Sequence, residues 1–121
     1  MTYESTIRIE SGISPGVAFV VNKMSFGRRM ELVRSIREIA LRCEYLNAGQ
    51  STEEKLGATL LSAQIDQLYL TWGLRELIGL EVDGGPATPE VLASAGPENL
   101  FREAVTIIKS QCGLNETERK N

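Results

Sequence analysis

The sequence contains no histidine and only two aspartates, Asp66 and Asp83. Without histidine, the chain cannot form Ser-His or Cys-His nucleophile pairs, imidazole bases or histidine-containing zinc sites. Asp83 stands in a turn sequence, and Asp66 falls between two apolar stripes of a predicted helix, where we expect it to be solvated or paired. We therefore predict that the protein is not an enzyme and has no catalytic residue, cofactor or metal.

Cysteines and glycine-rich segments are also scarce. Cys43 and Cys112 lie far apart without CxxC spacing, so we expect two reduced, buried thiols in a cytosolic protein. Adjacent glycines occur only at Gly84-Gly85, and no P-loop or dinucleotide-binding pattern predicts a phosphate site. No apolar run approaches the roughly 18 residues of a membrane span, and no signal-peptide layout is present, so we expect neither spanning nor export.

Charge is unevenly distributed along the chain. The net charge is −3 over 121 residues, a length that predicts one domain, residues 1–121. Residues 23–42 contain six basic and two acidic residues, and residues 43–121 contain six basic and twelve acidic residues. The basic segment could bind nucleic acid, but Glu31 and Glu38 interrupt it and the chain is acidic overall. We interpret it as a solvated, salt-bridged face, and we do not expect nucleic acid as the partner.

Residues 1–22 have few helix signals. Residues 6–10 alternate between polar and apolar side chains, residues 11–16 are typical of a turn, and residues 17–21 form a short apolar run. The pattern predicts either a small β-hairpin or a loose arm. A hairpin would have to dock on the helices or pair with a partner strand, because an isolated hairpin is only marginally stable.

Two long helices follow. Ser25 is a predicted cap for a helix over residues 25–47, which has one apolar stripe. Ser51 and Glu54 fit a capping box at the start of a helix over residues 52–79. This second helix has apolar side chains on two roughly opposite sides, so both sides must be covered. Because the chain is short, we expect one cover to come from another molecule.

The remaining residues predict two shorter helices. Asp83-Gly84 is a turn signal. Thr88 and Pro89 begin a helix that ends near Ala95, and the last helix covers residues 97–111. Residues 114–121 are predicted to be a flexible tail after a helical core of residues 25–113. The predicted fold class is therefore mainly α: a helical hairpin, two shorter C-terminal helices and a small N-terminal β-hairpin or arm.

The two stripes of the helix over residues 52–79 predict separate roles. The predicted partner contacts are one stripe together with a basic rim: Leu61, Ile65, Leu68, Trp72, Arg34, Arg37 and Arg42. The other stripe is predicted to fill the core: Leu56, Leu60, Leu74, Leu77 and Ile78. The periodicity does not decide which stripe has which role, and Trp72 is compatible with either core or interface.

The order of signals in residues 55–121 resembles a known family. The resemblance is carried by Trp72-Gly73-Leu74, Ile78-Gly79-Leu80-Glu81-Val82-Asp83-Gly84, Thr88-Pro89-Glu90, Gly96-Pro97-Glu98-Asn99-Leu100 and the segment 113–121. These segments resemble the tail assembly chaperones of tailed bacteriophages and prophages, which are encoded between the tail tube and tape measure genes. The family shares a layout more than a motif, and no catalytic residue carries over.

The resemblance implies a mostly helical protein of the bacterial host cytoplasm. Such a protein forms homo-oligomers and coats the hydrophobic tape measure protein until the tail tube protein polymerises around it. A ribosomal frameshift near the C-terminus is common in the family, and Arg119-Lys120-Asn121 could be encoded by a slippery heptamer. Alternatives are a head–tail connector or tail completion protein, a nucleic-acid-binding regulator using residues 23–42, and an inhibitor of a host defence enzyme.

Overall fold

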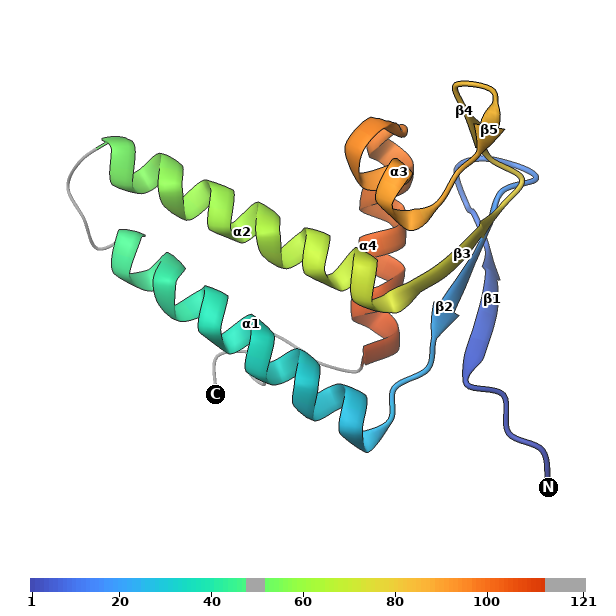
Figure 1. Cartoon of the computed structure of the whole chain (residues 1–121), viewed down its shortest axis with the longest axis horizontal. Helices are drawn as coiled ribbons and strands as arrows, with labels where there is room; N and C mark the ends of the chain where they lie inside the picture. The colour runs from blue at the N-terminus through green and yellow to red at the C-terminus, as the bar shows by residue number, and fades with distance from the viewer. Residues whose placement is uncertain (48–51, 113–121) are drawn as a thin grey trace.

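The chain begins with an antiparallel β-hairpin, which confirms the hairpin rather than the loose arm. In the computed structural model, which describes residues 1–47 and 52–112, β1 (Thr6–Glu10) pairs with β2 (Ala18–Asn22). Ile7 lies opposite Val21 and Ile9 opposite Phe19, so the apolar side chains share one face of the hairpin. That face packs against the helices and stabilises the hairpin (Figure 1).

The two long helices form the expected helical hairpin. α1 (Phe26–Asn47) begins after Ser25, whose Oγ accepts a hydrogen bond of 3.2 Å from the Arg28 N–H. α2 (Thr52–Gly73) runs back beside α1, and Figure 1 shows the connected ends of both helices projecting away from the rest of the fold. The hairpin is therefore an arm that is anchored at one end.

The second helix is shorter than predicted. It ends at Gly73, and residues Leu74–Ile78 form a strand, β3, which pairs antiparallel with β2. Leu74 lies opposite Val21 and Glu76 opposite Val20, so Arg75 is the extra residue of a β-bulge. The bulge places Leu74 and Leu77 on the same face although they are three residues apart. That spacing is the helical one, and it explains why the prediction of a helix to residue 79 is wrong.

The prediction of a mainly α fold is also wrong. β3 completes a three-stranded antiparallel sheet in the order β1-β2-β3, and the structure is a mixed α and β fold (Figure 1). The pairing joins Ala18 to Ile78 across the whole helical hairpin. Local periodicity does not report pairing between segments so far apart in the chain.

The C-terminal elements follow their sequence signals closely. β4 (Glu81–Val82) and β5 (Gly85–Pro86) flank a two-residue turn in which Asp83 and Gly84 both have positive φ, the type I′ geometry that Asp-Gly favours. α3 (Pro89–Ala95) begins at Thr88, whose side chain accepts from the Val91 N–H. α4 is Glu98–Cys112. These caps and turns confirm the predicted positions within about one residue.

The three-stranded sheet, the parts of α1 and α2 nearest to it, and α3 and α4 share one core. Its most buried large side chains come from five different elements: Phe19, Val21, Leu32, Tyr69, Leu70, Leu92 and Ile108. Asp66 of α2 adds a polar contact to α4, because its carboxylate oxygens accept from Arg102 Nη1 at 2.8 Å and from Lys109 Nζ at 3.0 Å. The expectation that Asp66 is solvated or paired is confirmed.

Several predictions concern residues outside the described part of the chain. The capping box of Ser51 and the tail of residues 114–121 lie there, as do the side chains of Cys43 and Cys112.

Candidate partner-binding groove

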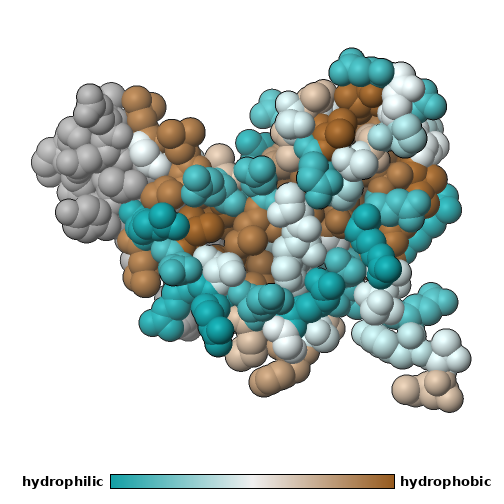
Figure 2. All heavy atoms as spheres, viewed as in Figure 1, coloured by the Kyte–Doolittle hydropathy of each residue, from teal (hydrophilic) through white to brown (hydrophobic). Residues whose placement is uncertain are grey.

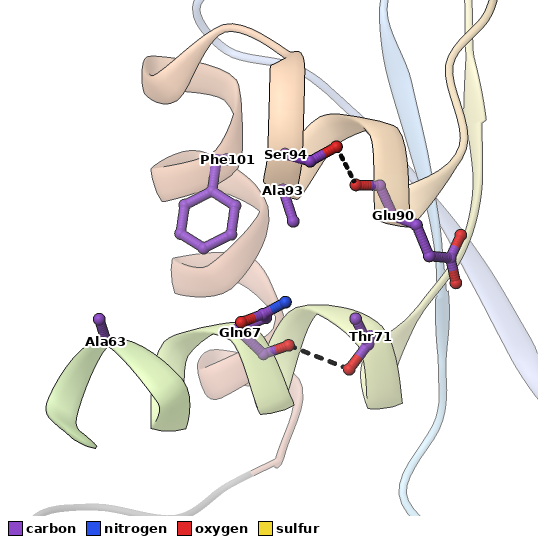
Figure 3. Close-up of a pocket in the computed structure, with 7 residues that line it drawn as sticks. All are labelled: Ala63, Gln67, Thr71, Glu90, Ala93, Ser94 and Phe101. Atoms are coloured by element: carbon purple, nitrogen blue, oxygen red, sulfur yellow. Dashed lines mark hydrogen bonds between the residues drawn. The ribbon is translucent and has the colours of Figure 1, made fainter. Parts of the chain in front are cut away.

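A groove lies where α2 passes under α3 and the first turns of α4. It encloses about 490 Å³ and is open to solvent. Seven residues line it: Ala63, Gln67, Thr71, Glu90, Ala93, Ser94 and Phe101 (Figure 3). The three contributing helices are held together beside the groove by the shared core and by the Asp66 contacts to α4.

The groove combines hydroxyl and amide groups with apolar contact area. The hydroxyl groups of Thr71 and Ser94 each donate 3.0 Å hydrogen bonds to carbonyl oxygens of their own helices, at Gln67 and Glu90 (Figure 3). The ring of Phe101 and the methyl groups of Ala63 and Ala93 supply apolar contact area. The amide of Gln67 adds one hydrogen-bonding group between α2 and α3. This combination suits a ligand that presents an apolar side chain next to a polar group.

Two exposed leucines extend the groove along the arm. Leu56 and Leu60 precede Ala63, Gln67 and Thr71 at spacings of four, three, four and four residues, so all five lie on one face of α2. The leucines are 60% and 67% exposed. Figure 2 shows hydrophobic residues along the upper side of the arm. The combined surface is about 22 Å long from residue 56 to residue 71, at 1.5 Å per helical residue.

The predicted partner stripe lies on the other side of α2. Ile65, Leu68 and Trp72 are half-buried and pack against the core, and Leu61 is also half-buried. The guanidinium of Arg28 lies 5.6 Å from the centre of the Trp72 ring. The structure therefore places Ile65, Leu68 and Trp72 against the core, and the contact of all four residues with a partner stays a prediction.

The predicted core stripe divides into two parts. Leu74 and Leu77 are buried in β3 and Ile78 is half-buried there, as core residues. The prediction that Leu56 and Leu60 fill the core is wrong, because α3 and α4 cover only the second half of this face of α2. The sequence signal for the exposed surface is the stripe that contains Leu56 and Leu60, because the other elements of the monomer cover only part of its length.

The predicted basic rim does not border the groove. Arg34, Arg37 and Arg42 are exposed on α1, which lies across α2 from α3 (Figure 1). Glu31 and Glu38 are exposed on the same helix. Two exposed acidic side chains therefore interrupt the basic ones on α1, as in a solvated face, and a nucleic-acid interface gains no support from this arrangement.

α1 has an exposed apolar strip that was not predicted from the sequence. Phe26, Met30, Val33 and Leu41 are all exposed and fall on one side of the helix at spacings of four, three and eight residues. The signal that could have found it is the width of the apolar face of α1, which exceeds the stripe needed for packing on α2. Both helices of the arm thus have apolar side chains that the monomer leaves open.

No family model, curated protein or solved structure matches this chain. Among the described residues, no group of three or more acidic or cysteine side chains could hold a metal ion. None of the helices in residues 1–47 and 52–112 is long and apolar enough to cross a membrane.

Proposed function

We propose that this protein is a non-enzymatic tail assembly chaperone of a tailed phage or prophage. It acts in the bacterial host cytoplasm, self-associates and binds an amphipathic helical segment of the tape measure protein until the tail tube protein surrounds it. The groove of α2, α3 and α4 receives that segment, with Leu56 and Leu60 contacting its apolar side.

One observation carries the proposal. Leu56 and Leu60 are more than half exposed on a helical face that leads directly into a groove. Apolar residues in such a row favour an amphipathic helix as the ligand, because helix-in-groove recognition uses anchors at helical spacing. The removal of apolar surface from water, at about 25 cal/mol per Å², would drive the association.

Co-purification with the tape measure protein tests the proposal. The chain would be co-expressed with the tape measure protein of the same phage, as wild type, as Leu56→Glu/Leu60→Glu and as Ser110→Glu. Ser110 is exposed on α4 outside the groove and is the control for an added charge. We expect wild type and Ser110→Glu to retain the tape measure protein in solution, and the double variant to lose it.

The outcome also separates the chaperone from a connector or tail completion protein. A chaperone is absent from finished particles, whereas a connector is a stoichiometric component of them. Retention of the tape measure protein by the double variant would show that it does not bind through Leu56, Leu60 and the groove. Detection of the protein in purified virions would contradict the chaperone role itself.

A further inference from the structure

The outer edge of β1 is open. The order β1-β2-β3 leaves β1 with one strand neighbour in the described part of the chain. Its pairing with β2 runs from Thr6 to Glu10 without a bulge, and it contains no proline or lysine. Bulges, prolines and lysines are among the devices that protect an edge strand from pairing with another chain, and β1 has none of these three; the charged residues of this short strand are Arg8 and Glu10.

The hydrogen-bond pattern identifies the backbone groups on that edge. The Lys23 N–H donates to the Ser5 carbonyl and the Ser11 N–H to the Val17 carbonyl, both at 2.8 Å. Hydrogen-bonded pairs alternate along an antiparallel ladder, so odd-numbered residues of β1 direct their backbone groups toward β2. The N–H and C=O groups of Thr6, Arg8 and Glu10 therefore point outward, where a further strand would bond them.

The side chains on that edge are complementary to themselves. Arg8 and Glu10 are both exposed on one face of β1, and within one chain their Nε and Oε1 atoms are 3.1 Å apart. A second copy of β1, placed antiparallel with Ile9 opposite Ile9, brings each Arg8 opposite the Glu10 of the other chain. A shift that places Arg8 opposite Arg8, or Glu10 opposite Glu10, sets like charges against each other, which destabilises a pair.

Backbone and side chains select the same register. With Ile9 on the two-fold axis, Arg8 and Glu10 of opposite chains are hydrogen-bonded pairs that use the outward groups identified above. Ile9 then meets its copy at a non-hydrogen-bonded site, where Cα atoms approach to about 4.5 Å. Ile7, 37% exposed at the same edge, would be covered by the partner strand's end.

We propose that two copies of this chain associate through β1 in this register, forming a continuous six-stranded antiparallel sheet. The occupant of the edge is a second copy because the charges match in a two-fold arrangement and the apolar residue falls on the axis. The inference specifies the surface for the self-association in the proposed function and rests on that part of it. The groove is on other elements and remains free in the dimer.

Charge reversal tests the pairing. Arg8→Glu makes the edge acidic and Glu10→Arg makes it basic, so each variant alone would oppose like charges twice across the axis. We expect wild type to show twice the monomer mass in sedimentation velocity at high protein concentration. Each single variant should raise the dimer dissociation constant by about tenfold or more. Circular dichroism melts would show that both variants fold.

Mixing the two variants is the decisive step. The acidic and basic edges complement each other in the same register, so an equimolar mixture should regain the dimer that each variant alone forms only weakly. An effect confined to the Arg8–Glu10 contact within one chain would not produce this recovery. The double variant Arg8→Glu/Glu10→Arg should dimerise like wild type.

Two results would overturn the inference, and they differ in what they leave standing. A wild type that remains monomeric at every concentration contradicts both the β1 pairing and self-association, while the tape measure assay still decides the role of the groove. A wild-type oligomer that neither variant weakens places self-association on another surface and removes only the β1 edge.

Discussion

The side chain of Ile108 on α4 occupies the space beside the Cα of Gly73 at the end of α2. A Cβ atom at position 73 would lie 2.5 Å from the Cγ2 atom of Ile108, closer than real contacts allow. Gly73 thus leaves room for Ile108 of α4, and it is also where the chain changes from helix to strand. The close contact with Ile108 depends on the missing side chain.

Gly73→Ala should destabilise the protein by about 1–3 kcal/mol through overpacking. In the background of Ile108→Ala, the same change should cost much less, because the methyl group of the new alanine would enter vacated space. Urea unfolding of the four proteins in this double-mutant cycle measures the coupling. Equal costs in both backgrounds would show that the backbone at residue 73, and not Ile108, sets the requirement for glycine.

A charge introduced on the two sides of α2 should have different effects on stability. Leu68→Glu places a carboxylate among half-buried side chains that pack on the core, so we expect a loss of about 2 kcal/mol or more in the free energy of unfolding. Leu60→Glu lies on the exposed side and should change that free energy by no more than about 0.5 kcal/mol. Thermal melts of both variants give the comparison, and a reversed order would contradict the orientation of α2.

Glu103 of α4 should control the order of the loop that joins β1 to β2. Its Oε1 accepts from Ser11 Oγ at 2.6 Å, and its Oε2 accepts from the Gly12 N–H at 2.7 Å. Glu103→Ala removes both charge-assisted bonds, so amide hydrogen exchange should accelerate at Gly12 and its neighbours. Glu98→Ala is the matched control, because Glu98 is on the same helix and largely exposed. Unchanged exchange at Gly12 would mean that the loop holds itself in place.

Asp66→Asn should weaken the contact between α2 and α4 in a salt-dependent manner. The variant loses the negative charge between Arg102 and Lys109, both of which are partly exposed, so we expect a cost of about 1 kcal/mol at low salt. High salt screens such pairs, and the difference from wild type should shrink there. Urea unfolding at two salt concentrations measures this, and a difference that is independent of salt would assign the effect to packing.

The parts of the fold that short sequence signals specify could be predicted. Ser25, Thr88 and Pro89 mark helix starts by satisfying or tolerating free backbone N–H groups, and Asp83-Gly84 marks a turn by accepting positive φ. Each of these signals acts within about four residues. They are therefore readable without knowledge of the rest of the chain.

The third strand could not be predicted in this way. Leu70, Leu74 and Leu77 follow one another at helical spacing, and only the bulge at Arg75 reconciles that spacing with a strand. The open face of α2 depends likewise on distant elements. The sequence predicts a two-sided helix, but the positions of α3 and α4 decide that Leu60 is exposed while Leu70 is buried.

The pairing of β2 with β3 has a consequence for synthesis of the chain. Ala18 cannot meet Ile78 until some sixty further residues have been translated, including the whole of α1 and α2. At about 5–20 residues per second, the outer edges of the β1–β2 hairpin stay unpaired for several seconds during translation. Early formation of the helical hairpin would shorten the effective loop and bring β3 to its site as soon as it emerges. The arm is therefore suited to guide the nascent chain as well as to contact a partner.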